Sequence, residues 1–301
     1  MRLAIISDIH GNMEAFQQTL VDIKHSGVDL IVNLGDSIGY GPEPEEVLYT
    51  IQKEKIVNIL GNHEKAIFDR TYRRYSMAGA RETIEHTIEF LTPSLISYIQ
   101  NLPTFRVINN ALFVHGCPPR SPTIYLNHLS ISEIKKVFES YSQSISFAGH
   151  THRLMLFSYD GEKISLNPLK EKTVDLDPEL KHIINVGSVG QHRDGDPRAK
   201  YVIWDDKRNT LEIKRITYDI AVTAAKIIER GFLKKDADKN NVKTLNIFYI
   251  IFFACLATTA LYCLYNSQGR TAFIGLFIFL VIFSYLQSKK GLIIITDVPI
   301  A

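Results

Sequence analysis

Cysteine is scarce in this 301-residue chain, and its three cysteines show no close spacing of a metal or redox site. They are Cys117, Cys255 and Cys263, and an odd number argues against a disulfide framework. We therefore expect a reducing compartment. The chain also lacks a basic opening stretch followed by an apolar core, so we expect no cleaved secretion signal.

A dominant charge is also missing. The chain has 34 lysines and arginines against 32 aspartates and glutamates, a formal net charge of +2. This balance gives no electrostatic footprint for a nucleic acid, so we expect no specific nucleic-acid binding. The length is too great for one small domain and suits one large domain with an appendage.

Charged residues are absent from two stretches near the end of the chain. A polar linker over 233–244 precedes a first uncharged run over 245–265, which is long enough to cross a bilayer as a helix. A second run over 271–287 is near the lower limit for spanning. Lysines flank the outer ends of both runs, whereas the connecting turn holds only Arg270.

This pattern predicts a C-terminal transmembrane helical hairpin over 245–288, followed by a short tail over 289–301. By the positive-inside rule we expect a multi-pass cell-membrane protein whose N-terminal domain faces the cytoplasm. The alternative is a buried helical hairpin in a soluble oligomer, and the oligomeric state stays open.

Residues 1–232 alternate between strand and helix patterns, which is typical of an α/β domain with parallel β-α-β units. Later segments are short strands separated by turn residues, beginning with a hairpin at Asn109-Asn110. We expect two mixed β-sheets with helices outside, the first mostly parallel and the second richer in antiparallel pairs. The predicted strands are 3–6, 30–34, 56–60, 105–108, 112–115, 145–148, 153–159, 162–166, 183–186, 200–204 and 210–216. The predicted helices are 13–25, 42–53, 76–91, 93–101, 130–141 and 219–230.

Five predicted strands end in residues that can bind a metal ion, each beside a glycine. Taken alone, Asp8 and Asn12 could merely cap the helix that follows them. Open α/β sheets, however, bind ligands at the carboxyl ends of their strands, and five such ends are hard to explain as ordinary turns. The five blocks are Asp8-Ile9-His10-Gly11, Gly35-Asp36, Gly61-Asn62-His63, His115-Gly116 and Gly149-His150-Thr151-His152.

These blocks supply seven oxygen and nitrogen ligands. If one carboxylate bridges, the set gives four protein contacts to each of two ions and leaves positions for water and substrate. Two divalent ions can clamp both oxygens of an in-line displacement and lower the pKa of a bridging water. The absence of thiolates disfavours a structural zinc site, and mixed ligands accept Mn, Fe, Co, Ni or Zn. The candidate ligands are Asp8, His10, Asp36, Asn62, His115, His150 and His152.

The five blocks resemble those of the calcineurin-like metallophosphoesterase superfamily, which run Asp-x-His, Gly-Asp, Gly-Asn-His-Asp/Glu, His-Gly and Gly-His-x-His. The resemblance covers roughly residues 1–220, and Gly39-Tyr40-Gly41-Pro42 looks like the bacterial and archaeal branch near the YfcE-like and diadenosine-tetraphosphatase-like enzymes. It implies a four-layer αββα sandwich.

The resemblance also implies a role for each site residue. His63 would protonate the leaving oxygen or stabilise the phosphoryl charge, which suits an imidazole. The alternative for His63 is a helix-start histidine that bonds only to the backbone. Glu64 stands where many members have Asp, a departure that bears on how His63 is oriented. One ion would be held by Asp8, His10, Asp36 and His152, and the other by Asp36, Asn62, His115 and His150, with Asp36 as the bridge.

The segment over 185–198 resembles one seen near the active site in this branch. Arg193 or Arg198 could grip a substrate phosphate with a bidentate fork, although a surface loop with paired charges explains them equally well. Cys117 is expected to be a small packed residue. The segment Tyr72–Tyr75 mixes aromatic and basic residues as a nucleotide contact would, but an exposed helix face is the preferred interpretation.

We therefore predict a membrane-tethered phosphatase or phosphodiesterase that hydrolyses a P–O bond with water activated by two divalent metal ions. The substrate would be a phosphoester small molecule or a nucleotide, and the choice between monoester and diester stays open. The alternative is a non-catalytic membrane-tethered scaffold or regulatory protein that retains the fold. The complete ligand set argues against it.

Overall fold

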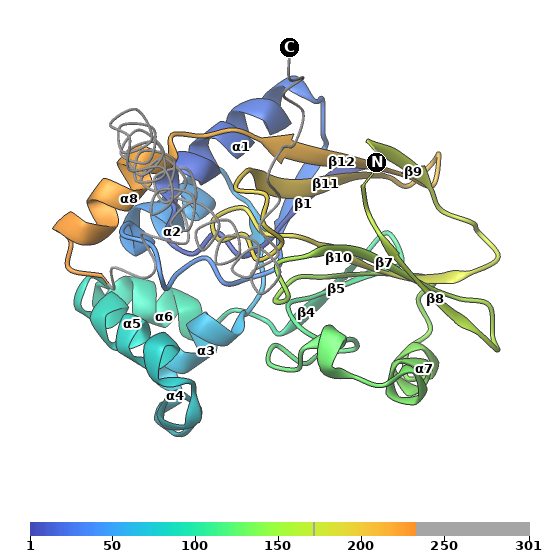
Figure 1. Cartoon of the computed structure of the whole chain (residues 1–301), viewed down its shortest axis with the longest axis horizontal. Coiled ribbons are helices and arrows are strands. Elements are labelled where there is room, and N and C mark those ends of the chain that lie inside the picture. The colour runs from blue at the N-terminus through green and yellow to red at the C-terminus, as the bar shows by residue number, and fades with distance from the viewer. Residues whose placement is uncertain (171, 233–301) are drawn as a thin grey trace, which may run out of the picture. The chain divides into compact units, whose positions relative to one another are not determined.

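The computed structural model describes residues 1–170 and 172–232, where the strands form two six-stranded mixed sheets (Figure 1). Sheet 1 has the order β3-β2-β1-β11-β12-β9, and sheet 2 has the order β4-β5-β6-β10-β7-β8. The strands of sheet 1 are β1 (Arg2–Ile6), β2 (Leu30–Asn33), β3 (Val57–Asn58), β9 (Thr173–Asp175), β11 (Ala199–Asp205) and β12 (Thr210–Ile216). Those of sheet 2 are β4 (Phe105–Ile108), β5 (Ala111–Val114), β6 (Ile145–Ala148), β7 (Leu154–Tyr159), β8 (Ile164–Pro168) and β10 (Lys181–Val186).

The sheets pack face to face, and helices cover their outer faces (Figure 1). On β1, Leu3 and Ile5 join the core between the sheets, whereas Ala4 and Ile6 face α1 (Met13–His25) and α2 (Pro44–Lys53). This alternation follows the period of two of a strand, and the continuous apolar run reflects burial on both faces. On the far side, α7 (Ile131–Glu139) packs against sheet 2 through Phe138. The predicted αββα order is therefore the order of the layers.

The distribution of parallel and antiparallel strands differs from the prediction. Sheet 1 has two parallel and three antiparallel pairs, and so does sheet 2. Sheet 1 is not mostly parallel because β11, late in the chain, pairs antiparallel with β1, with Ile5 opposite Val202. It brings β12 and β9 into the same sheet.

The predicted helix ends agree with the observed caps. The Asn12 side chain accepts a hydrogen bond from the N–H of Ala15 at 3.1 Å, and Ser130 and Glu133 form the capping box of α7. The other helices are α3 (Asn62–Phe68), α4 (Arg70–Tyr75), α5 (Ala78–Glu89), α6 (Pro93–Gln100), α8 (Ile220–Glu229) and the 3₁₀ turn η1 (Leu126–His128). The list of predicted helices omitted α3 and α4, although an exposed helix face was the preferred interpretation of Tyr72–Tyr75, and strand β9 was missed.

Within residues 1–170 and 172–232, no helix combines the length and the apolar character that a bilayer crossing requires. The predicted hairpin over 245–265 and 271–287, its linker and the tail lie outside the described residues.

Candidate metal centre

The five sequence blocks meet where strands of the two sheets end. Asp8 and His10 follow β1, Asp36 follows β2, His115 follows β5, and His150 with His152 follows β6, while Asn62 opens α3 after β3. All six of the aspartate and histidine candidates are at most 2% exposed. The structure therefore brings the predicted ligands of both sheets into one buried site.

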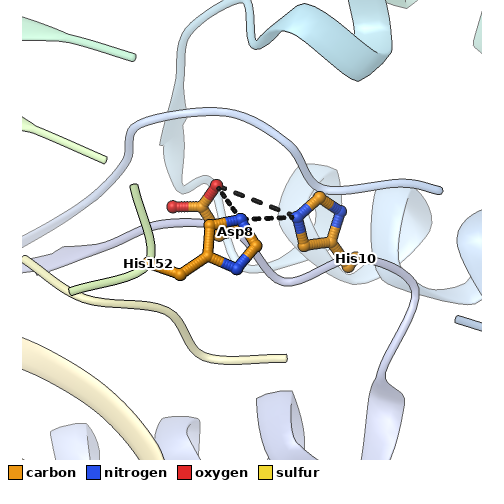
Figure 2. Close-up of side chains that lie close together, drawn as sticks. All are labelled: Asp8, His10 and His152. Atoms are coloured by element: carbon orange, nitrogen blue, oxygen red, sulfur yellow. Dashed lines mark hydrogen bonds and ion pairs between the residues drawn. The ribbon is translucent and has the colours of Figure 1, made fainter. Parts of the chain in front are cut away.

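A first group consists of Asp8, His10 and His152, whose polar atoms turn toward one another in Figure 2. Nε2 of His152 lies 3.2 Å from Oδ1 of Asp8 and 3.2 Å from Nε2 of His10. Nε2 of His10 lies 3.8 Å from the same Asp8 oxygen. Three potential ligand atoms thus converge on one point.

A second group consists of Asp36, His115 and His150, with Asn62 beside them. Nε2 of His115 lies 3.2 Å from Oδ2 of Asp36, 3.2 Å from Nδ1 of His150 and 3.1 Å from Oδ1 of Asn62. Oδ2 of Asp36 also lies 3.9 Å from Nε2 of His10 in the first group. Asp36 therefore stands between the two groups.

The histidines present lone pairs to these groups because their other ring nitrogens are engaged by backbone carbonyls. A carbonyl can only accept, so the ring nitrogen that faces it must carry the proton and the opposite nitrogen is free to bind a metal. The pairs are His10 Nδ1 with Ile38 O at 3.0 Å, His115 Nδ1 with Leu34 O at 3.0 Å, His150 Nε2 with Thr123 O at 3.3 Å, and His152 Nδ1 with Gln191 O.

The carboxylates of Asp8 and Asp36 are each fixed by a main-chain hydrogen bond to one of their two oxygens. Oδ2 of Asp8 accepts from the N–H of His150 at 3.0 Å, and Oδ1 of Asp36 accepts from the N–H of His63 at 2.8 Å. Oδ1 of Asp8 is buried and has no hydrogen-bond partner among the described residues. Buried lone pairs that face one another repel unless a cation lies between them. This donor set fits divalent metal ions.

The titration behaviour agrees with this fit. Burial would raise the pKa of Asp36, but His115 and His63 lower it well below its usual value. Burial lowers the pKa of His150 to about 3 and that of His10 well below the usual value. Burial acts the same way on His115, yet Asp36 outweighs it and raises the pKa to about 9. A metal ion bound by His115 would replace that proton.

Five of the candidate ligands have left-handed backbone conformations. The φ angles are 55° for Asp8, 50° for His10, 51° for Asp36, 64° for His150 and 59° for His152. Such a conformation costs a non-glycine residue about 1–2 kcal/mol. Backbone strain of this kind gathers at functional sites, where packing of the loops enforces it.

His63 lies beside the two groups and forms a further set of converging ligand atoms with His10 and Asp36. Its Nε2 is 3.9 Å from Oδ2 of Asp36, and its ring contacts those of His10 and Tyr40 with centroids 4.8 and 4.7 Å away. Nδ1 of His63 has no hydrogen-bond partner in the described part of the chain. Burial lowers the pKa of His63 to about 4, and the charge of Arg193 acts in the same direction.

Glu64 orients the Asp36 loop rather than the His63 ring. Its carboxylate accepts hydrogen bonds from the N–H groups of Asp36 at 2.8 Å, Ser37 at 2.6 Å and Gly61 at 3.1 Å. Burial and the nearby Asp36 raise the pKa of Glu64 to about 7. The replacement of the usual Asp by Glu64 therefore bears on how the Asp36 loop is held.

A loop over 39–43 covers His63 and is tied to α8. A Cβ on Gly39 would lie 2.1 Å from Nδ1 of His63, so only glycine fits there without displacing the ring. Lys226 of α8 contacts Oε1 of Glu43 at 2.8 Å, and Arg230 donates to the carbonyl of Pro42 at 2.9 Å. Sequence reasoning missed this connection, because no local pattern links residues nearly 190 positions apart.

The two candidate arginines differ in their surroundings. The guanidinium of Arg198 forms a two-pronged ion pair with Asp196, with Nη2 2.6 Å from Oδ2, and its electrostatic partners are Asp196 and Asp194. The structure thus does not bring Arg198 to the metal groups. Arg193 is partly buried and interacts electrostatically with Asp8 and Tyr125.

Two tyrosines lie at the site: Tyr125, which was not predicted, and Tyr72, for which an exposed helix face was preferred over a substrate contact. The ring of Tyr125 stacks on His150 with centroids 3.6 Å apart, and its hydroxyl hydrogen-bonds Arg193. Helix α4 has no buried residue, as expected of an exposed face, yet the side chain of Tyr72 hydrogen-bonds Asn62. Aromatic residues in the sequence around α4 were the only signal. Cys117 is packed in the core, as predicted.

Residues 1–209 match the calcineurin-like phosphoesterase superfamily domain. An uncharacterized protein of Methanocaldococcus jannaschii is 33% identical over 231 residues, which cover 75% of this chain and 92% of that protein. The crystal structure of a metallophosphoesterase from Sphaerobacter thermophilus is similar with a TM-score of 0.70 and 29% identity, covering 80% of this chain and 98% of that one. A hypothetical protein from Pyrococcus horikoshii OT3 shares the fold, with a TM-score of 0.64, 17% identity, and coverage of 79% and 97%.

Proposed function

The chain belongs to the calcineurin-like phosphoesterase superfamily and is a hydrolase that acts on phosphoric esters, and we propose that it cleaves a P–O bond with two divalent metal ions. One observation carries the proposal of two ions: Asp36 stands between two groups of converging ligand atoms. Bound ions would polarise the phosphoryl oxygens and lower the pKa of a water molecule.

The proposed ligands divide along the two groups. Asp8, His10 and His152 hold one ion, His115, His150 and Asn62 hold the other, and Asp36 contributes to both. The backbone carbonyls behind the imidazoles fix the ring orientation and direct the inner nitrogens toward the metal positions.

His63 is the proposed donor to the leaving oxygen or the phosphoryl group. The two proposed ligand sets are complete without His63, although it also converges with His10 and Asp36. Its Nδ1 packs against Gly39, so Nε2, which lies 3.9 Å from Oδ2 of Asp36, is the nitrogen that would serve the substrate. A ring N–H aimed at developing negative charge stabilises the transition state without reorganisation. Asn62 and His63 are adjacent, so one helix start supplies both a ligand and this donor.

Replacement of Asp36 by alanine tests the proposal. The full-length Asp36→Ala protein, supplied with Mn²⁺, should lose hydrolysis of p-nitrophenyl phosphate and of bis-p-nitrophenyl phosphate, because both groups lose their shared ligand. Asp175→Ala, at an exposed position on β9, is the matched control and should retain activity. Full activity in a folded Asp36→Ala protein, as judged by circular dichroism, would disprove the assignment.

We further propose that residues 245–265 and 271–287 anchor the enzyme as a membrane hairpin with the catalytic domain on the cytoplasmic side. Their uncharged sequence supports this proposal, together with the lysines at the outer ends. A lysine costs about 2.5–3.5 kcal/mol at the centre of a membrane helix. The double variant Leu256→Lys and Leu280→Lys should therefore leave the carbonate-washed membrane fraction, where the unmodified chain should stay. Equal retention would contradict the hairpin.

A further inference from the structure

Arg193 is a partly buried cation beside the metal groups, and it forms no ion pair with a carboxylate in the described part of the chain. Its Nη2 donates to Oε1 of Gln191 at 3.3 Å, and its guanidinium meets the hydroxyl of Tyr125. Both of these partners are neutral, and Asp8, whose charge also acts on the guanidinium, forms no ion pair with it among the described residues. A charge withdrawn from water is costly unless it is paired, so an anionic partner should come from outside the chain.

Gln191 adds a second unused donor at the same place. The side chain is 2% exposed, and its Nε2 has no hydrogen-bond partner among residues 1–170 and 172–232. Its Oε1 is engaged by Arg193, which leaves the amino end of the amide to another acceptor. A buried N–H group without an acceptor destabilises a fold, and native proteins keep such groups few.

The segment that carries these two side chains is fixed to the first metal group. Ser188 donates through its hydroxyl to the carbonyl of Asp8 at 2.9 Å, and the N–H of Gly190 donates to the same carbonyl at 2.9 Å. The backbone carbonyl of Gln191 accepts from His152. The position of Gln191 is therefore set by two metal ligands.

The other end of the segment is held by a buried lysine. Lys200 is 1% exposed, and its ammonium group contacts Asp194 at 3.0 Å and the carbonyls of Asp196 and Arg198 at 2.6 and 3.2 Å. Arg193 thus lies between two anchored stretches. A guanidinium presented on a fixed loop loses little freedom when it binds an anion.

We propose that Gln191 and Arg193 form a subsite for a terminal oxygen of a phosphomonoester dianion, which makes this enzyme a phosphatase for monoesters. The proposal rests on the phosphoesterase function above and names its substrate class. A monoester carries one more charged terminal oxygen than a diester, and that oxygen is an acceptor for both the guanidinium and the buried amide. In the reaction, water adds to phosphorus, the P–O bond to the alcohol breaks, the alcohol oxygen takes a proton, and inorganic phosphate is released.

The subsite predicts a substrate-dependent effect of Gln191→Met, which keeps the length of the side chain and removes the donor. For the full-length protein with Mn²⁺, kcat/KM for p-nitrophenyl phosphate should fall by about tenfold or more, the loss expected for one charge-assisted hydrogen bond. For bis-p-nitrophenyl phosphate, which has the same leaving group, the change should stay within about threefold. Gln18→Met, at an exposed position on α1, is the matched control and should change neither.

A binding measurement provides the second readout. Inorganic phosphate should raise the Tm of the Mn²⁺-loaded unmodified protein, and this shift should shrink in Gln191→Met and in Arg193→Gln. The matched control for the second variant is Arg208→Gln, whose exposed arginine lies in the β11–β12 turn.

Equal losses on the monoester and the diester, or an unchanged phosphate shift in both variants, would overturn the subsite. Failure of the unmodified protein to hydrolyse either ester would contradict the proposed function instead, and the phosphate shift would still decide whether the subsite exists. If Gln191→Met unfolds, Arg193→Gln supplies both measurements, because the arginine side chain is only partly buried.

Discussion

The carboxylate of Asp8 accepts a hydrogen bond from the main-chain N–H of His150 at 3.0 Å. Asp8 belongs to the first metal group and His150 to the second, so this bond joins the two groups directly. The other oxygen of Asp8 faces His152 at 3.2 Å and has no hydrogen-bond partner among the described residues. One carboxylate therefore has a structural oxygen and an oxygen available to a metal ion.

The different roles of the two Asp8 oxygens predict the effect of Asp8→Asn. The asparagine oxygen can still accept from His150, but its amino group would face the metal position. Free Mn²⁺ at a hundredfold excess over Kd should raise the free energy of unfolding of the unmodified chain by about 2.7 kcal/mol. Asp8→Asn should lose most of this gain in urea titrations with and without Mn²⁺. An undiminished gain would remove Asp8 from the ligand set.

Glu64 provides a second prediction, because its carboxylate accepts three backbone hydrogen bonds around Asp36. Glu64→Gln would turn an amino group toward N–H donors and should lower the free energy of unfolding by about 1–3 kcal/mol. Mn²⁺ affinity, measured by calorimetry, should fall about 10- to 100-fold, as expected for a residue that positions a ligand. Glu64→Asp keeps the charge, so its Mn²⁺ affinity should lie between those of the unmodified protein and Glu64→Gln. Equal affinities of the Gln and Asp variants would contradict this role.

Gly39 offers a test of His63 that leaves every metal ligand intact. A Cβ at Gly39 would lie 2.1 Å from Nδ1 of His63, so Gly39→Ala should displace the ring and lower kcat by about 10²-fold or more, while Mn²⁺ binding persists. Gly161→Ala is the matched control, since Gly161 also has a positive φ but nothing within 4 Å of its Cβ position. Similar losses of kcat in both variants would attribute the effect to backbone strain.

His182 is expected to make stability depend on pH outside the metal site. Its Nε2 donates to the carbonyl of Asp177 at 2.9 Å and its Nδ1 accepts from Ser158 at 2.9 Å, while burial lowers its pKa. The unfolded chain therefore takes up a proton near pH 6.5 that the folded chain resists, and stability falls as the pH falls below that value.

Replacement of His182 by asparagine should reduce this dependence. Between pH 7.5 and 5, the slope of unfolding free energy against pH should differ from that of the unmodified chain by up to about 1.4 kcal/mol per pH unit. The titrating groups of the metal site are common to both proteins and cancel in the comparison. Parallel curves would show that His182 accepts its proton in the folded state.

The predicted ligands converged because each one directly follows a strand, and strand ends are local features of the sequence. Asp8 and Asp36 needed only the order of strands in sheet 1 to lie side by side, whereas His115, which follows β5 of sheet 2, also needed the two sheets to pack face to face. The pairing of β11 with β1 was not predictable in this way, because a strand late in the chain can enter a sheet at any position. The antiparallel pairs of sheet 1 depended on that single insertion, because β12 and β9 join the sheet through β11.

The side chains that Arg193 and Arg198 contact could not be predicted from the sequence pattern either. Arg193 and Arg198 stand five residues apart in one segment, and only the fold shows that Asp196 engages Arg198. Tyr125 and Tyr72 reach the site from a loop and a short exposed helix, where no periodicity indicates direction. Contacts of this kind depend on how loops close over strand ends.

Because α8 is bonded to the loop over 39–43, a force applied to the chain after Phe232 would be transmitted to that loop. Tension on the chain beyond α8 would load the contacts of Phe232 with His86 and Phe90, and then the bonds of Arg230 to the carbonyl of Pro42 and of Lys226 to Glu43. The same loop presses Gly39 against His63. Release of these bonds would therefore free the loop that packs on His63, the proposed proton donor, while the candidate metal ligands, which follow strands of the two sheets, keep their places.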